Sequence, residues 1–327
     1  MKLATYRDGT RDGRLVAVST DLQAAAYVAD VAPTMQAALD DWDELSPYLQ
    51  ARCRSLDAGE LAGAFPFDAA MCMAPLPRAY QWADGSAYLN HVELVRKARG
   101  AAMPPELYES PLMYQGGSDT MLGANDPVAC PDESFGIDFE AELAVITTDV
   151  PMGAGVQEAE AAIRLVMLVN DVSLRNLIPA ELAKGFGFLQ SKPASAFSPV
   201  AVTPDELGDA WREGRFHVSL RVHRNEYLVG RPDCGTGMHF SFPQLISHLC
   251  RTRSAGAGTI VGSGTVSNAD RTKGYACIAE QRMIETIDNG QPVTAFLRYG
   301  ESVTIEAFGG DGKSIFGAIR QQVVPAG

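Results

Sequence analysis

The segment 136–146 constrains the fold more than any other part of the chain. It reads GIDFEAELAVI, and its acidic residues alternate with apolar ones. Such alternation predicts a β-strand that directs Asp138, Glu140 and Glu142 to one face and the apolar side chains to the other. Two carboxylates separated by one residue lie about 7 Å apart at Cα, close enough for both to bind one cation. A solvent-exposed strand face explains the three acids equally well at this point.

The first ~75 residues differ in pattern from the rest of the chain. Two short strand-like runs, at 2–6 and 14–19, precede helical periodicity over 35–56. The segment Ala74–Arg78 contains two prolines and favours an extended linker. We therefore expect a small N-terminal domain over residues 1–75 and a second, larger domain over 76–327.

Beyond the linker, short β-rich segments alternate with turns rich in glycine, aspartate and asparagine. This spacing favours a mostly-β fold with some α-helices, an α+β class, over a doubly wound sheet. Three-to-four-residue apolar spacing predicts helices over Tyr88–Arg99, Val156–Val169 and Phe242–Thr252.

Composition limits the partners and the compartment. The chain has 27 basic and 40 acidic residues, a formal charge of −13, which disfavours nucleic acid and anionic membranes as partners. The sequence offers no apolar membrane span or secretory leader, so we expect a cytoplasmic protein. Its six cysteines form no CxxC pair, which indicates reduced, buried thiols rather than disulfides or a thiolate zinc site.

Two further segments carry residues suited to chemistry. Asp171 follows the apolar run 165–169, and Arg175 lies four residues later. Asp84 precedes His91 by seven residues at a predicted helix start, where an acid and an imidazole can converge. Taken singly, each has a structural explanation: an Asp–Arg pair at the end of an element, and a histidine that begins a helix.

Several well-known catalytic motifs are missing from the sequence. It contains no GxSxG, no GxxxxGK(S/T), no HExxH and no GxGxxG after a strand. These absences disfavour a serine hydrolase, a P-loop ATPase, a zincin and a Rossmann dehydrogenase.

Taken in order, the acidic segments resemble the fumarylacetoacetate hydrolase family, in its shorter bacterial form. The family pattern has an Asp about seven residues before a His, then ExE on a strand, a further Asp and a Lys. The matching residues are Asp84, His91, Glu140, Glu142, Asp171 and Lys192. The segment 262–268, GSGTVSN, resembles a glycine-rich loop of the family. The resemblance runs from about Ala74 to Val323 and implies the family's β-roll catalytic domain.

The resemblance also implies a role for each site residue. Four acids would bind Mg²⁺ or Ca²⁺, with Mn²⁺ as a further possibility: Asp84, Glu140, Glu142 and Asp171. His91 would be the base that activates water, supported by Glu280 or, as a stand-in, Glu285. Lys192 and Arg175 would stabilise the oxyanion and the substrate carboxylate. Tyr114 and Thr265 match substrate-contacting positions.

The implied activity is hydrolysis of a carbon–carbon bond in a small anionic 1,3-diketo acid. Fumarylacetoacetate, from tyrosine degradation, or a related acylpyruvate is the expected substrate, and a homodimer is the expected assembly. Ile178 and Leu182 replace a Gln and a Tyr of the animal enzymes, which predicts a less polar substrate tail. The alternatives are a decarboxylase, hydratase or tautomerase of a related keto acid, and a non-catalytic, metal-stabilised binding protein.

Overall fold

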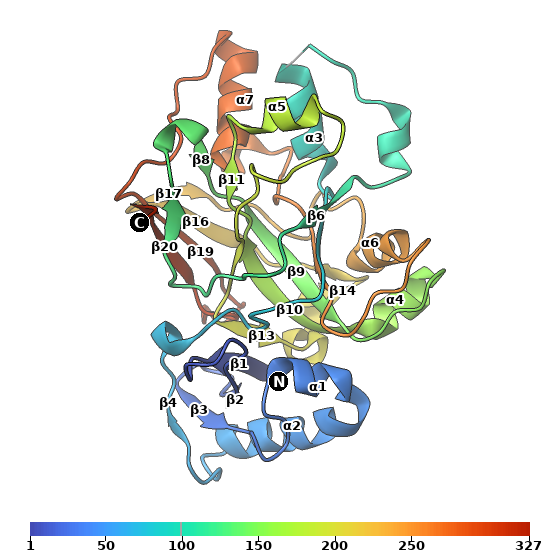
Figure 1. The fold of residues 1–327 in the computed structure, drawn as a ribbon, viewed down its shortest axis with the longest axis vertical. Coiled ribbons are helices and arrows are strands. Elements are labelled where there is room, and N and C mark those ends of the chain that lie inside the picture. The colour runs from blue at the N-terminus through green and yellow to red at the C-terminus, as the bar shows by residue number, and fades with distance from the viewer. Residues whose placement is uncertain (99) are drawn as a thin grey trace.

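The structure is a computed structural model that describes residues 1–98 and 100–327 of the chain (Figure 1). Within these residues the largest sheet has eleven strands. Neighbours pair in the order β4 (Phe65–Pro66), β3 (Ala24–Tyr27), β2 (Arg14–Val18), β1 (Lys2–Tyr6), β13 (Val200–Val202), β10 (Ile163–Asn170), β9 (Ala141–Thr147), β18 (Ile260–Gly262), β5 (Trp82–Gly85) and β6 (Met113–Gly116), with β12 (Ala196–Phe197) beside β10. These pairs are antiparallel except β18 and β5, which are parallel.

A second sheet packs against the first where β19 and β20 contact β10. Its order is β17 (Tyr227–Gly230), β16 (Leu220–Arg224), β19 (Ser302–Ala307), β20 (Ile319–Pro325) and β7 (Val128–Cys130). Two short pairs complete the strands: β8 (Ile137–Asp138) with β11 (Ser173–Leu174), and β14 (Trp211–Arg212) with β15 (Arg215–Phe216).

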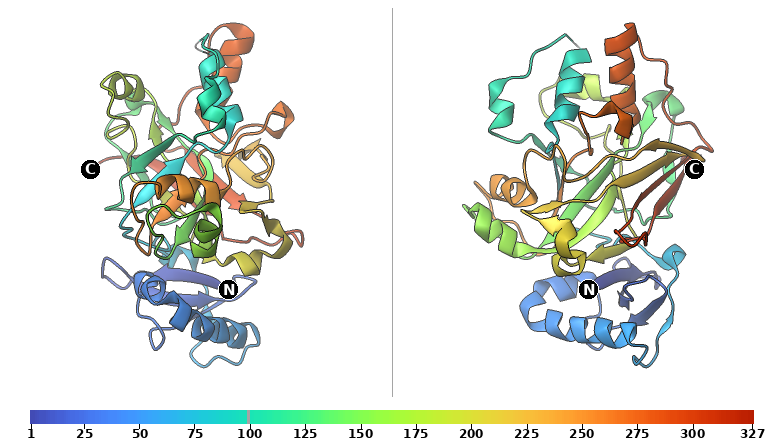
Figure 2. Two further views of the ribbon diagram at one scale, coloured as in Figure 1. Left: turned by 90° about the vertical axis from the view of Figure 1, so that its right-hand side faces the viewer. Right: turned by 180° about the vertical axis from the view of Figure 1, so that it is seen from behind.

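Helices cover both ends of the molecule (Figure 2). The N-terminal pair is α1 (Met35–Asp40) and α2 (Trp42–Asp57), and at the opposite end α3 (Leu89–Ala98) packs on α7 (Ile278–Asn289). The other helices are α4 (Val156–Ala162), α5 (Ile178–Leu182) and α6 (Phe242–Leu249). Short 3₁₀ turns are η1 (Ala69–Met71), η2 (Pro105–Tyr108), η3 (Glu133–Phe135), η4 (Pro204–Ala210) and η5 (Arg271–Lys273). Within the described residues, no helix is both long and apolar enough to cross a membrane.

The N-terminal segment has its own helices but shares the large sheet with the rest of the chain. Strand β1 pairs with β13, with Leu3 opposite Ala201. The mixed helix and strand content confirms the predicted α+β class. The division after residue 75 remains a prediction.

The helix predicted over Val156–Val169 is wrong in its second half. Helix α4 ends at Ala162, and strand β10 begins at Ile163. The apolar run of β10 faces two cores, because Val166 and Leu168 pack with the second sheet while alternate residues pack toward α1 and α2. A strand buried on both faces has a continuous apolar run, and its periodicity does not distinguish it from a buried helix.

The strand predicted over 136–146 is interrupted. Residues Phe139 and Glu140 separate β8 from β9, because β8 turns away to pair with β11. Asp138 therefore leaves the common face of the acids. Its carboxylate instead accepts from the backbone N–H of Ile278 and Ala279 at 2.8 and 2.9 Å, where α7 begins.

The other predicted helices exist with shifted ends. The helix over 35–56 is divided at Asp41, whose φ of −122° and ψ of 37° are not helical. Helix α6 ends at Leu249 rather than Thr252. Helix α3 begins at Leu89, and the predicted end at Arg99 lies outside the described residues.

Candidate active site

Three carboxylates from different strands converge at one buried point. Asp84 lies in β5, Glu142 in β9, and Asp171 directly after β10. Each offers an oxygen within 4.8 Å of the others, and the exposed fractions are 7%, 0% and 0%. We call these residues the carboxylate cluster. The strand order β10, β9, β18, β5 explains the convergence, because β9, which carries Glu142, lies next to β10 and two strands from β5.

Two glycines make room for Asp84. A Cβ on Gly262 would lie 2.3 Å from Asp84 Oδ1, and one on Gly264 would lie 2.2 Å from the carbonyl oxygen of Gly85. Gly264 also has φ of +73°, which side chains disfavour. Its backbone N–H donates to Asp84 Oδ1 at 2.9 Å. The glycine-rich loop thus allows the close backbone approach that fixes this carboxylate.

The negative charge of the cluster is only partly compensated by the protein. Burial, and then the neighbouring acids, raise the pKa of Asp84 and of Glu142 well above their usual values. Among the described residues, Glu142 Oε2 is buried without a hydrogen-bond partner. A buried, unpaired carboxylate oxygen among other carboxylates fits a bound divalent cation, because the ion supplies the missing charge and ligand.

Asp171 differs from its two neighbours because it is hydrogen-bonded on both oxygens. Oδ2 accepts from Lys192 Nζ at 2.6 Å and from the Tyr114 hydroxyl at 2.6 Å, and Oδ1 accepts from Ser195 Oγ at 2.7 Å. Lys192 Nζ lies 5.2 Å from the centre of the Tyr114 ring. Asp171 is therefore held in place without a cation.

Glu140 lies beside the cluster but is bound to basic residues. Its Oε1 accepts from Arg175 at 2.6 Å and from Thr265 Oγ1 at 2.9 Å, while Oε2 accepts from Lys192 at 2.5 Å and from Ser173 Oγ at 3.2 Å. Burial raises the pKa of this group, but Arg175, Lys192 and His91 outweigh it and hold the pKa well below its usual value. Glu140 is thus a stable anion, and its place as a metal ligand remains a prediction.

Arg175 contacts Asp138 and Glu140 rather than Asp171. Its Nε donates to Asp138 Oδ2 at 2.8 Å, and its Nη2 donates to Glu140. The Asp–Arg pair that the sequence suggested between residues 171 and 175 is therefore replaced by a longer-range one.

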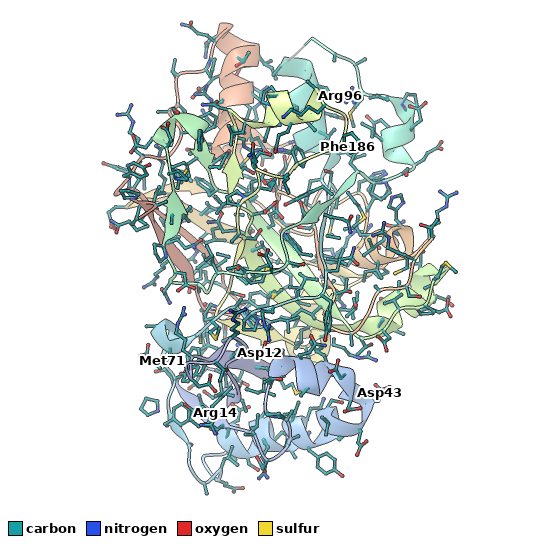
Figure 3. All side chains as sticks on the ribbon, in the orientation of Figure 1. Asp12, Arg14, Asp43, Met71, Arg96 and Phe186 are labelled. Atoms are coloured by element: carbon teal, nitrogen blue, oxygen red, sulfur yellow. The ribbon has the colours of Figure 1, made fainter. Side chains whose placement is uncertain are left out.

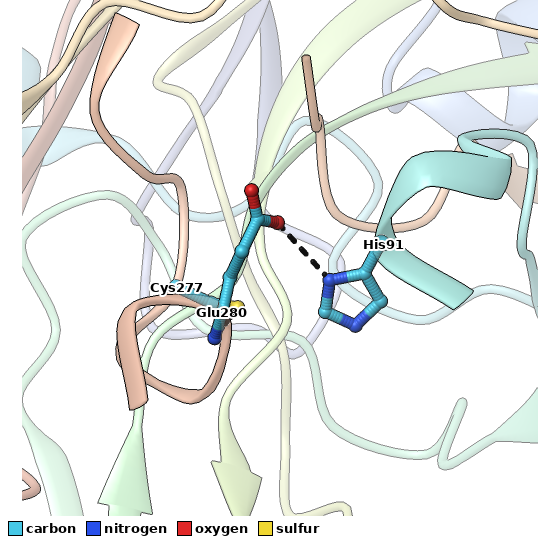
Figure 4. A group of neighbouring side chains, drawn as sticks. All are labelled: His91, Cys277 and Glu280. Atoms are coloured by element: carbon cyan, nitrogen blue, oxygen red, sulfur yellow. Dashed lines mark hydrogen bonds and ion pairs between the residues drawn. The ribbon is translucent and has the colours of Figure 1, made fainter. Parts of the chain in front are cut away.

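A histidine–glutamate pair forms where α3 packs on α7. His91 Nδ1 lies 3.2 Å from Glu280 Oε2, and Glu280 Oε1 accepts from Ser267 Oγ at 3.0 Å (Figure 4). A carboxylate on Nδ1 favours the tautomer with its proton there, which leaves Nε2 as the basic nitrogen. We call these two residues the histidine pair.

Glu280, not Glu285, is the acid beside the histidine. Glu285 lies one to two turns further along α7, where it accepts from the backbone N–H of Val293 and Thr294 at 2.7 and 2.9 Å. Burial raises the pKa of Glu285, but these bonds and that to the Thr294 hydroxyl lower it to about 2. Its role is to hold the chain that follows the helix.

The loop 262–268 joins the carboxylate cluster to the histidine pair. Gly264 N–H contacts Asp84, Thr265 Oγ1 contacts Glu140, and Ser267 Oγ contacts Glu280. Gly264 and Ser267 are three residues apart, which is at most about 10 Å along the chain, so the two groups lie within reach of one small molecule.

The predicted substrate-binding residues are only partly brought together. Tyr114 and Thr265 contact the acids, as described above. Ile178 is partly buried in α5, and Leu182 at its end is 43% exposed. In the segment after α5, Phe188 packs edge-on against Tyr114 at 5.3 Å, whereas Phe186 is fully exposed (Figure 3). The roles of Ile178 and Leu182 remain predictions.

Several residues of the site carry no signal in the sequence. Ser195 is an isolated serine, and Ser267 lies in the segment 262–268 without being distinguished by it, because the contacts of the two serines with Asp171 and Glu280 depend on tertiary packing. Glu181 accepts from the backbone N–H of residues 189, 190 and 191, and so fixes the chain just before Lys192. Burial raises the pKa of Glu181, but its hydrogen bonds lower it to about 2. Sequence spacing alone does not reveal hydrogen bonds of this kind.

Cys277 is a further residue of this region. It precedes α7, and its Sγ accepts from the backbone N–H of Glu280 at 3.4 Å. Burial raises the pKa of the thiol well above its usual value, which argues against a thiolate nucleophile. All six cysteines are unpaired and buried, as predicted.

Two protein-family models match the chain. The fumarylacetoacetate (FAA) hydrolase C-terminal model matches residues 81–324, and the fumarylacetoacetase N-terminal domain 2 model matches residues 1–78. The chain belongs to the fumarylacetoacetate hydrolase family. The resemblance predicted from the ordered acidic motifs is thereby confirmed.

Proteins similar to this chain have different activities. The 2,4-didehydro-3-deoxy-L-rhamnonate hydrolase of Sphingomonas sp. (strain SKA58) is 29% identical over 158 residues, which span 47% of this chain and about half, 52%, of that relative. Maleylpyruvate hydrolase from Sphingobium sp. SYK-6, in complex with manganese(II) and pyruvate, has a TM-score of 0.65 at 16% identity over both full chains. The 5-carboxymethyl-2-hydroxymuconate delta-isomerase of Mycobacterium smegmatis has a TM-score of 0.62 at 15% identity, again over both full chains. Proteins that share this fold therefore include a hydrolase and an isomerase.

Proposed function

We propose that this family member is a divalent-metal-dependent hydrolase that cleaves a carbon–carbon bond in a small 1,3-diketo acid, either fumarylacetoacetate or a related acylpyruvate. The observation that carries the proposal is the histidine pair, joined by the loop 262–268 to a buried carboxylate cluster. A metal site that only stabilises the fold needs no oriented base beside it, which disfavours a non-catalytic binding protein.

Asp84, Glu142 and Asp171 would hold the cation, and their oxygen atoms suit Mg²⁺, Mn²⁺ or Ca²⁺. When bound, such an ion supplies a Lewis acid that polarises carbonyl oxygens. Glu140 would complete the shell only by releasing a present partner, since its two oxygens already accept four hydrogen bonds.

His91 would act as the general base. With Glu280 on Nδ1, its Nε2 removes a proton from water, and the resulting hydroxide adds to a carbonyl carbon of the substrate. The bond between that carbon and the adjacent methylene carbon then breaks. Its electron pair leaves as an enolate of the remaining ketone, which takes up a proton. Ser267 keeps Glu280 oriented throughout by donating to its other oxygen.

Lys192 would supply a permanent positive charge beside the reacting carbonyls. Burial lowers its pKa, but Asp171 and Glu140 outweigh burial and raise the pKa above its usual value. An ammonium group has three donors, and two of them are directed at these acids. The third is available to an oxyanion or a substrate carboxylate, and the Arg175 guanidinium adds further donors nearby.

The decisive test is turnover of fumarylacetoacetate and simple acylpyruvates by the metal-free chain and by the chain with Mg²⁺ or Mn²⁺, carried out in ¹⁸O-labelled water. Hydrolysis yields two smaller products, one of which carries the label in a new carboxylate. Loss of CO₂ or an isomerised product without label would assign the site to a decarboxylase or an isomerase. No turnover of any diketo acid with either metal would refute the proposal.

A homodimer built through the C-terminal domain is proposed from the family resemblance. Sedimentation velocity at micromolar concentration measures it directly, and a 35.0 kDa species would contradict it.

A further inference from the structure

Cys277 and the histidine pair together form a group of potential metal ligands distinct from the carboxylate cluster. One ligand atom from each of Cys277, His91 and Glu280 lies within 4.8 Å of the others (Figure 4). The sulfur is directed toward the first turn of α7 because it accepts from the backbone N–H of Glu280. The group thus offers one sulfur, one nitrogen and one oxygen atom.

The separations are near those of a tetrahedral site. Bonds of about 2.0–2.2 Å to nitrogen and oxygen and about 2.3 Å to sulfur place neighbouring ligand atoms about 3.4–3.6 Å apart. His91 Nδ1 and Glu280 Oε2 are already 3.2 Å apart. From the 4.8 Å limit of the group, the sulfur needs to approach by at most about 1.4 Å. Side-chain rotation supplies such a movement without a change of fold.

The two groups of ligands suit different ions. The carboxylate cluster contains only oxygen, which hard ions such as Mg²⁺ prefer. A cysteine sulfur, which releases its proton to solvent when the ion binds, and an imidazole nitrogen instead select Zn²⁺ or another borderline or soft ion. His91 remains partly exposed, with 18% of its side chain accessible, so an ion can reach the group from solvent. The fourth position stays open to water or substrate.

We propose that Cys277, His91 and Glu280 form an inhibitory zinc site. The catalytic consequence rests on the proposed role of His91, but the binding itself does not. Zinc on Nδ1 replaces the proton that His91 shares with Glu280, and the neutral ring then carries its proton on Nε2. Because Nε2 no longer has a free lone pair, it cannot accept a proton from water. Zinc therefore inactivates the base while Mg²⁺ stays at the carboxylate cluster.

The binding test uses the full chain saturated with Mg²⁺ and one equivalent of Zn²⁺, examined by zinc X-ray absorption. We expect one sulfur ligand at about 2.3 Å and nitrogen or oxygen ligands at about 2.0–2.2 Å. A shell of oxygen and nitrogen alone would overturn the proposal, whether or not the chain hydrolyses any diketo acid. Because the wild-type chain is used, a folding defect in a variant cannot affect this result.

The functional test compares Cys277→Ser with Cys234→Ser, since both cysteines are completely buried and only the first lies in the group. Each variant is assayed with Mg²⁺ and increasing Zn²⁺, relative to its own uninhibited rate. We expect the zinc inhibition constant to rise at least about tenfold in Cys277→Ser and to be unchanged in Cys234→Ser. Equal inhibition of both variants would mean that zinc acts elsewhere, most simply at the carboxylate cluster. If Zn²⁺ did not lower the rate of the wild-type enzyme, the proposed inhibition would be refuted.

Discussion

The carboxylate cluster and the histidine pair are both contacted by the loop 262–268, yet they differ in how their charges are compensated. In the cluster, the pKa values of Asp84 and Glu142 are raised by burial and by neighbouring acids. In the histidine pair, Glu280 is bound to His91 and Ser267, so the protein itself satisfies the charge. The cluster therefore depends on an ion from outside, whereas the pair is organised before any ion binds. Changes to one should leave the other intact.

Glu142→Gln should break the cluster and give the largest effect. The amide keeps the shape but removes the charge and the unpartnered ligand oxygen. We expect kcat/KM with Mg²⁺ to fall about a thousandfold or more, because a Lewis acid contributes several kcal/mol to such reactions. Asp43→Asn, at an acid that is 93% exposed at the surface of α2 (Figure 3), is the matched control and should be neutral. Calorimetry should show weakened Mg²⁺ binding, and normal affinity would exclude Glu142 as a ligand.

His91→Ala should break the pair and leave the cluster intact. Loss of a positioned base should lower kcat about 10²–10⁴-fold, while the dissociation constant for Mg²⁺ stays within about threefold. His223→Ala, in strand β16 of the second sheet, is the control and should retain activity. If His91→Ala loses Mg²⁺ affinity as well, the two halves of the site are not independent.

The stability of the metal-free chain should depend on pH through the cluster. The folded pKa values of Asp84 and Glu142 are raised above 3.8 and 4.5, so their contribution to stability is fully present below about pH 4 and is lost as the pH rises through the folded values. With EDTA, the temperature of the unfolding midpoint should decrease as the pH is raised from about 5 to about 8. Added Mg²⁺ should raise this temperature more at the higher pH. Glu142→Gln should flatten the EDTA curve. If Mg²⁺ raised the unfolding midpoint equally at both pH values, the charge of the carboxylate cluster could not be uncompensated in the metal-free chain.

Ile178→Gln should have the smallest effect on catalysis, because it alters neither the carboxylate cluster nor the histidine pair. If α5 contacts the distal end of the substrate, the ratio of kcat/KM between polar-tailed and apolar-tailed diketo acids should shift by about 1–3 kcal/mol without loss of turnover. Pro179→Ala, beside it on the same helix, is a control for the helix itself. An unchanged ratio would remove Ile178 from the list of substrate contacts.

The sequence predicted the fold class and the residues that converge, because both follow from order and spacing along the chain. The alternation around Glu142 and the apolar run before Asp171 identify strand ends where acids gather. The same apolar run predicts a helix, and this prediction is wrong because both faces of β10 are buried. Spacing identifies the acids but not their partners.

The partners of those acids depend on contacts between distant parts of the chain. Glu140 is bound by Arg175 and Lys192, which lie 35 and 52 positions further along the chain. No local sequence pattern therefore distinguishes Glu140 from Glu142. Cys277 and His91 are likewise far apart in sequence, and a search for CxxC pairs cannot detect them. The choice between Glu280 and Glu285 required the packing of α3 on α7.

The pairing of β1 with β13 determines when the sheet is completed during synthesis. Leu3 pairs with Ala201, so the inner edge of the N-terminal hairpin lacks its partner until about two hundred further residues have been translated. At roughly 5–20 residues per second, this interval is about 10–40 s. An unpaired strand edge is a template for association with other chains. The yield of the native protein should therefore improve with slower initiation or added chaperone, even though no residue of the hairpin contributes to the active site.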